Sequence, residues 1–100
     1  MLESTSAETF LAHQGSEFEV RDPGQDDPIV LVLAEVRSLG HQPNAPRVDP
    51  FSLELTGPPA PVLEQRIYRL LHPVLGELEI FLVPIGPGAD GRLRYEAVFN

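Results

Sequence analysis

Cysteine is absent from the 100 residues of this chain. Its absence excludes disulfide bonds, thiolate metal ligands and cysteine nucleophiles, although it does not by itself settle the cellular compartment. The length is typical of one domain and is sufficient to bury one hydrophobic core. Because the 42% hydrophobic and 22% charged residues are close to globular averages, we expect a single folded domain over residues 1–100.

Positive charge and long hydrophobic runs are scarce as well. Seven Lys and Arg residues stand against fifteen Asp and Glu residues, which gives a formal net charge of -8 at pH 7. Such a protein repels phosphate backbones and anionic lipid, so we expect neither nucleic acid nor a membrane as a partner. No segment approaches the ~20 apolar residues of a membrane-spanning helix, and no basic stretch precedes an apolar run near the N-terminus. We therefore expect a cytoplasmic protein without a signal peptide or membrane span.

The N-terminal part of the sequence predicts a short helix. After about five flexible residues at positions 1–5, helical periodicity covers residues 6–14, with Thr5 at the capping position. Phe10 and Leu11 lie on the predicted apolar face. We expect this face to cover an open end or flank of a sheet.

Strand patterns fill residues 17–99. Apolar and polar side chains alternate, as in half-buried strands, in "EFEV", "FSLELTGP", "IYRLLH", "GELEIFLVPI" and "RLRYEAVF". The run "IVLVLAEV" is apolar on both faces and predicts a central or doubly covered strand. We expect Phe51, Leu53 and Leu55 to point inward and Ser52 outward, and we expect the "GELEIFLVPI" strand to become covered on both faces at Phe81.

Six closely spaced strands without helices between them predict an all-β fold with one short N-terminal helix. Parallel strands need long crossover connections, so the sheet should be mainly antiparallel. Closure into a small barrel and stacking into a two-layer sandwich both hide the apolar faces. The last two strands, joined by "GPGADG", predict a hairpin, and residues 38–50 form the longest loop, of a length that is often functional or mobile.

The histidines do not predict a metal site. His13, His41 and His72 are far apart in the sequence and lack the close spacing of ligand pairs. Because His72 precedes Pro73 at the end of a strand, we expect it to stabilise a turn.

The carboxylates do not predict a catalytic site either. Glu17 with Glu19, and Glu77 with Glu79, lie two apart on strands, about 6.5–7 Å from one another. Acid and base catalysis would also need a cleft and different environments for the two groups. "GPGADG" lacks the lysine and the following helix of a phosphate-binding loop. We expect no catalytic residue, no cofactor and no metal.

The residues that could instead meet a partner are a small set of arginines and aromatics: Arg66, Tyr68, Arg69, Arg92, Arg94 and Phe99. The arginines are expected first to pair across strands with Glu77, Glu79 or Glu96. Alternatively, these arginines form a rim that binds a partner.

The motifs "FSLELTGP", "YRLLHPVLGELEIFLVPIGP" and "YEAVFN" carry a resemblance. Over residues 10–100 the chain resembles a family of small bacterial proteins of unknown function that share FSLxFxGP, a Tyr before His-Pro, LGxxxxFLVP and a closing YEAVFN. The matching motif positions are Tyr68, His72, Pro73, Gly76, Phe81, Pro84 and Tyr95. Leu55 and Thr56 depart from the pattern, where an aromatic and a basic residue are commoner.

The resemblance implies a role without established catalytic residues. Some members of that family are encoded beside phage-tail-collar-like or tail-fibre-like proteins, which implies an accessory or assembly role. The leading hypothesis is therefore a non-enzymatic domain that binds a protein partner or a second copy of itself through strand edges, the loop at 40–50 or the C-terminus. The alternative is a small-ligand-binding barrel with Tyr68, Tyr95 and an arginine at its mouth.

Overall fold

The structure is a computed structural model that describes residues 6–21, 28–40 and 50–99. It contains one helix and six strands: α1 (Ala7–Leu11), β1 (Glu17–Val20), β2 (Ile29–Ser38), β3 (Phe51–Gly57), β4 (Arg66–His72), β5 (Gly76–Pro87) and β6 (Leu93–Phe99). All six strand pairings are antiparallel. The predicted all-β class is confirmed.

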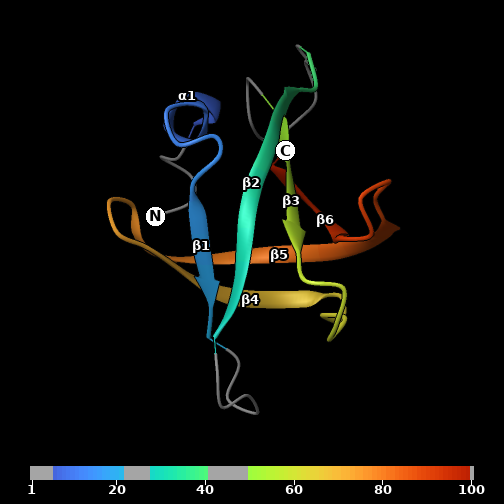
Figure 1. Cartoon of the computed structure of the whole chain (residues 1–100). Coiled ribbons are helices and arrows are strands. Elements are labelled where there is room, and N and C mark those ends of the chain that lie inside the picture. Colours follow the sequence, from blue (N-terminus) through green and yellow to red (C-terminus); the bar gives the residue numbers. More distant parts are fainter. Residues whose placement is uncertain (1–5, 22–27, 41–49, 100) are drawn as a thin grey trace.

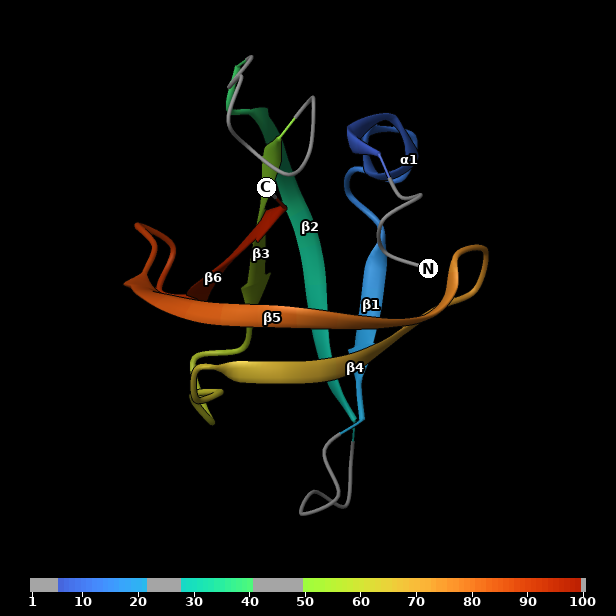
Figure 2. The ribbon, with the colours of Figure 1, turned by 180° about the vertical axis from the view of Figure 1, so that it is seen from behind.

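The strands close into a barrel in the order β1-β2-β3-β6-β5-β4. Strands β1, β2 and β3 form one meander along the chain, and β4, β5 and β6 form a second. In Figures 1 and 2, β4 and β5 run across the direction of β1, β2 and β3. The sequence left open a barrel or a sandwich, and the structure is the barrel.

The two seams that join the meanders differ greatly in length. Strands β3 and β6 pair along their whole length, from Phe51 opposite Phe99 to Gly57 opposite Leu93. Strands β1 and β4 have only two register pairs, Glu19 with Leu71 and Val20 with Leu70. One further backbone bond, from the Arg21 N–H to the Arg69 carbonyl (3.1 Å), extends this short seam.

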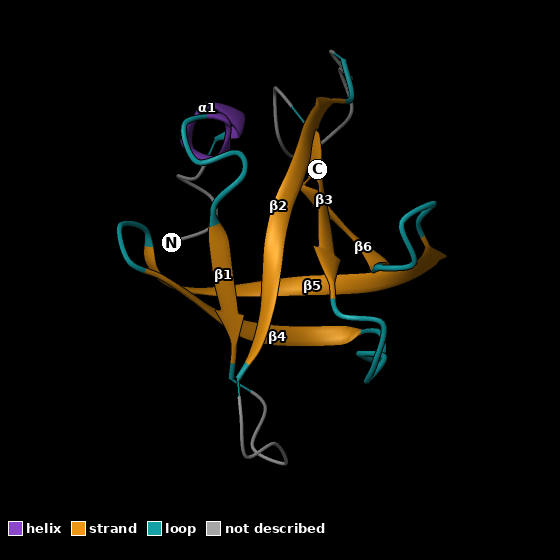
Figure 3. Ribbon diagram, viewed as in Figure 1, coloured by secondary structure: helices purple, strands orange, loops and turns teal. Residues whose placement is uncertain are grey.

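Two irregularities let the strands bend around the barrel. The register of β2 against β3 shifts between Leu33 and Glu35, and the register of β5 against β6 shifts between Pro84 and Gly86. At the first shift the Ala34 carbonyl accepts a hydrogen bond from the Gln14 side-chain amide (3.1 Å). Bulges of this kind bend a strand, so β5 can pair first with β4 and then with β6, as Figure 3 shows.

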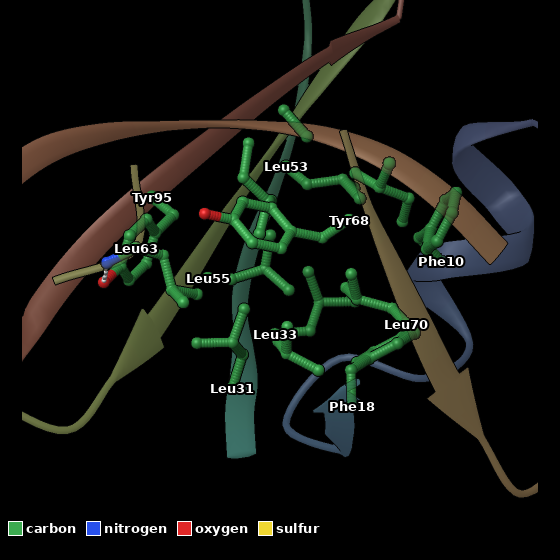
Figure 4. Packing of buried hydrophobic residues seen from close by; sticks show 14 of the residues in the cluster. Phe10, Phe18, Leu31, Leu33, Leu53, Leu55, Leu63, Tyr68, Leu70 and Tyr95 are labelled. Carbon is green, nitrogen blue, oxygen red and sulfur yellow. Dashed lines mark hydrogen bonds between the residues drawn. The ribbon is translucent and has the colours of Figure 1, made fainter. Parts of the chain in front are cut away.

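The core lies inside the barrel and is made by alternate residues of every strand (Figure 4). Its largest fully buried side chains include Phe18, Leu33, Leu70 and Tyr95. Burying one such side chain stabilises the fold by about 1.5–3 kcal/mol. The strong alternation of these sequences is therefore explained by burial.

An aromatic cluster closes the barrel beneath α1. Phe51 and Phe99 are register partners whose rings stack at 4.6 Å, and the Phe10 ring lies 5.9 Å and 5.6 Å from them. Phe10 is fully buried, as predicted, whereas Leu11 is 50% exposed. The helix thus covers the barrel mainly through Phe10, with Ala7 also packed against the core, and the prediction that Leu11 shares this role is wrong.

The helix is also shorter than predicted. It spans Ala7–Leu11 instead of residues 6–14, and its N-terminal capping residue is Ser6, whose side chain makes no capping hydrogen bond. Thr5 lies outside the described residues, as do the predicted flexible residues 1–5 and most of the predicted loop, 41–49. A five-residue helix has too few internal hydrogen bonds to be set by its own sequence, so Phe10 packing determines its extent.

Three predictions about strand faces need correction. Ser52 lies on the outer face, as expected, opposite the exposed Val98, but it is only 5% exposed. Phe81 was expected to be covered, but it is 47% exposed on the outer face of β5. In β2 only alternate residues from Ile29 to Leu33 are fully buried, so one face of this strand is covered and the other is half-buried.

Candidate functional site

Two of the six predicted interaction residues belong to the core. Tyr68 is 4% exposed, and its hydroxyl donates a hydrogen bond to the Glu64 carbonyl (2.7 Å). Phe99 is 8% exposed and stacks on Phe51. Both are therefore structural, because alternation along β4 and β6 turns them into the barrel. The expectation that they meet a partner is wrong.

Arg94 of β6 and Arg92, which directly precedes β6, bond to residues of β3. The guanidinium of Arg94 donates two hydrogen bonds to the Glu54 carboxylate, at 3.1 and 3.2 Å. These hydrogen bonds, and then the charge of Glu54, raise the pKa of Arg94. Arg92 donates to the Thr56 carbonyl (3.3 Å). Cross-strand pairing was predicted, but the acid is Glu54 instead of Glu77, Glu79 or Glu96.

Arg66 and Arg69 remain on the surface. Arg69 forms an ion pair with Glu77 (2.8 Å), one of the predicted acids, and both side chains are more than half exposed. The guanidinium carbon of Arg66 lies 4.8 Å from the centre of the Tyr68 ring, a distance at which a cation and an aromatic face attract one another. Exposed pairs of this kind contribute little to stability.

An apolar pair lies beside Arg69 on the outer face of β4 and β5. Ile67 and Phe81 are register partners, and they are 61% and 47% exposed. Arg69 and Glu79 are the next outward partners along the same two strands. We call Ile67, Phe81, Arg69 and Glu79 the β4–β5 face. The sequence signal for it was present, since Phe81 shares the phase of Glu77 and Glu79.

A groove of about 510 Å³ lies at the other end of β4. It is lined by Ser16, Glu17, Glu19, Leu71, His72 and Pro73. Glu17 is exposed and Glu19 is half-buried, whereas the His72 side chain forms part of the wall and is only 6% exposed. The groove therefore brings a serine hydroxyl, two carboxylates and an imidazole near one another.

The hydrogen bonds of His72 fix the form of its ring. The Nδ1 atom accepts from the backbone N–H groups of Val74 (3.0 Å) and Leu75 (3.1 Å), so it carries no proton. The proton of the neutral ring is then on Nε2, which donates to the Ser16 hydroxyl at 3.0 Å. The Ser16 hydroxyl in turn donates to the His13 carbonyl. The predicted turn-stabilising role of His72 is confirmed.

This arrangement is unsuited to nucleophilic catalysis. A histidine that activates a serine must accept the serine proton, usually on Nε2, while an acid holds the proton on Nδ1. In this chain the Nε2 of His72 is the donor, and Nδ1 faces two backbone donors instead of an acid. Burial, and then the neighbouring His13, lower the pKa of His72. Ser16 and His72 therefore form a structural link between the segment before β1 and the β4–β5 turn.

Within residues 6–21, 28–40 and 50–99, no three His, Cys, Asp or Glu side chains form a cluster that could hold a metal ion. In the same residues no helix has the length and apolar character needed to cross a membrane.

Comparison with known families gives a match over almost the whole chain. The model of a domain of unknown function, DUF6916, matches residues 5–99. The chain belongs to this family. None of the curated proteins and none of the solved structures matches it. Membership agrees with the resemblance to a family of unknown function, while the shared motifs and the tail-associated neighbours stay predictions.

Proposed function

We propose that this domain is non-enzymatic and acts by protein–protein contact, as an accessory component of a larger assembly. The observation that supports the proposal is the β4–β5 face. Ile67 and Phe81 are paired across two strands and are more than half and almost half exposed. Single exposed apolar residues are common on soluble proteins, but a β-branched and an aromatic side chain placed opposite one another form a continuous apolar contact.

The rest of this face suits a protein partner. Arg69 and Glu79 lie directly beside the apolar pair and carry opposite charges. Interfaces commonly have an apolar centre with a polar rim, and aromatic and arginine side chains are enriched in them. The partner should therefore present an apolar residue flanked by both charges. The tail-like or fibre-like proteins implied by the resemblance are the partners to test first.

The alternative of a small-ligand-binding barrel has less support. It assigns Tyr68 and Tyr95 to the mouth of the barrel, but both rings are buried in the core. Their hydroxyls are bonded to the backbone, that of Tyr68 to the Glu64 carbonyl and that of Tyr95 to the Leu63 N–H. Side chains that already have these partners contribute to the fold instead of binding a ligand.

The test compares capture by three forms of the tagged protein from its native cells: wild type, Phe81→Lys and Val74→Lys. Val74 is the matched control because it is an apolar residue with still higher exposure, 71%, in the turn between β4 and β5. We expect wild type and Val74→Lys to recover the same tail-like or fibre-like protein and Phe81→Lys to lose it. Binding should then be reproduced with the two purified proteins.

Three results would contradict the proposal. These are equal recovery by wild type and Phe81→Lys, recovery of no specific partner, and recovery of the chain itself alone. Circular dichroism of each variant tests whether Phe81→Lys is folded. An outward lysine should leave the core intact, because Phe81 contributes no side chain to the buried cluster.

A further inference from the structure

His72 lies where the two meanders of the barrel meet. Its Nδ1 atom holds the β4–β5 turn through the Val74 and Leu75 N–H groups, and its Nε2 atom holds Ser16, just before β1. The ring also contacts Phe18 of β1, with ring centres 4.6 Å apart. One side chain therefore joins the first meander to the second.

This junction is at the end of the shortest seam. His72 directly follows Leu71, which with Leu70 provides the two register pairs between β4 and β1. By contrast, the β3–β6 seam has seven register pairs. Because few backbone bonds close β1 onto β4, the side-chain contacts of His72 add a further link on this side of the barrel, beside the buried Phe18, Val20 and Leu70.

A proton on His72 would disrupt this junction. It would occupy Nδ1, where the Val74 and Leu75 N–H groups already point, so both hydrogen bonds would be lost and donors would face one another. The resulting charge would also be in a site that is only 6% exposed, which disfavours the charged form of the ring.

Some charged groups around His72 favour its neutral form and others favour its protonated form. His13, in the turn after α1, has its ring 4.7 Å away, and burial followed by this neighbour lowers the pKa of His72. Glu17 and Glu19 of β1 line the same groove and favour a positive charge on the ring, but Glu17 is exposed and the half-buried Glu19 is paired with Arg21 at 3.7 Å. Glu77 of β5 is paired with Arg69. The net effect favours the neutral ring.

We propose that His72 is a pH-sensitive latch, which keeps the β1–β4 seam closed while its imidazole is neutral and releases the seam when the ring gains a proton. This inference is independent of the partner proposed above. Since the pKa of His72 is lower in the folded than in the unfolded chain, the stabilisation by this group is complete above the ordinary value of about 6.5. It declines as the pH falls below that value toward the lowered pKa.

The first test needs no substitution. We expect ¹⁵N NMR of the full chain to show the neutral His72 ring with its proton on Nε2 and a titration midpoint below that of free histidine. In hydrogen exchange at pH 5.5, we expect the Arg21 amide, which bonds the Arg69 carbonyl, to lose protection relative to pH 7. Amides of the β3–β6 seam should keep theirs. A proton on Nδ1, a midpoint at or above 6.5, or equal loss in both seams would overturn the proposal.

The second test uses His72→Asn, with His13→Gln as the matched control. An asparagine oxygen can accept from the turn at the position of Nδ1 but does not titrate in this range. From pH 7 to 5.5 the folding equilibrium constant of the wild-type chain should fall several-fold, with an upper limit of about tenfold per pH unit. His13→Gln should keep most of this fall and His72→Asn should lose it. An equal fall in His72→Asn and wild type would refute the latch.

Discussion

Removing the hydroxyl of Tyr95 should lower the free energy of unfolding. It accepts a hydrogen bond from the Leu63 N–H at 3.0 Å in a buried site. Tyr95→Phe keeps the ring but leaves this N–H without its acceptor, and an unsatisfied buried donor costs about 1–3 kcal/mol. For a domain of this size, each 1 kcal/mol lowers the melting temperature by roughly 4–8 °C.

Tyr68→Phe is the matched control. The Tyr68 hydroxyl donates to the Glu64 carbonyl in a site that is only partly buried, and water can replace the lost donor there. We expect a smaller cost, about 0.5–1.5 kcal/mol, which is the net value of an ordinary hydrogen bond. Urea unfolding at pH 7 measures both variants, with unchanged m-values as evidence that the compactness of the two states is unaltered. If Tyr95→Phe costs no more than Tyr68→Phe, the reasoning from the buried N–H is wrong.

Two further substitutions test the core by the same unfolding measurement. Gly57→Ala should cost about 1–3 kcal/mol because a Cβ atom at Gly57 would lie 2.6 Å from Leu31 Cδ2, which is fully buried. Gly88→Ala meets the partly exposed Arg94 side chain at 3.2 Å and should cost less, so equal costs would contradict the packing argument. Phe10→Ala should cost about 3–5 kcal/mol, the usual range for a buried aromatic, whereas Leu11→Ala on the exposed side of α1 should change stability by about 0.5 kcal/mol or less. A small effect of Phe10→Ala would show that α1 does not cover the barrel through this anchor.

The fold could be predicted where burial alternates strictly along the chain. Phe18, Leu53, Leu70 and Tyr95 each belong to a period-two pattern, and each is buried. The predicted hairpin is present as well, because β5 and β6 pair in an antiparallel ladder. The helix length could not be predicted in the same way, since it depends on one contact of Phe10 with residues far along the chain.

The surface contacts were less accessible to sequence reasoning. The partner of Arg94 is Glu54, on a strand whose pairing with β6 depends on how the two meanders come together. Likewise, His72 was expected to stabilise a turn, but its second partner, Ser16, is 56 residues away in the sequence. Phe81 was expected to be covered because it is apolar. Its position in the strand alternation, on the same face as Glu79, would have predicted the exposure that is observed.

Closure of the barrel has a consequence for aggregation and for the way a partner can bind. Each of the six strands has a neighbour on both sides, whereas the free edge of an open sheet is a template for pairing with other chains. The strand edges suggested as docking surfaces by the sequence are thus largely occupied. The register pairs of β4 with β1 cover Leu70 and Leu71, and those of β5 with β6 begin at Val83, so the protection against edge-to-edge stacking applies to these stretches. Ile67 and Phe81 lie outside them, and recognition there starts from their exposed side chains.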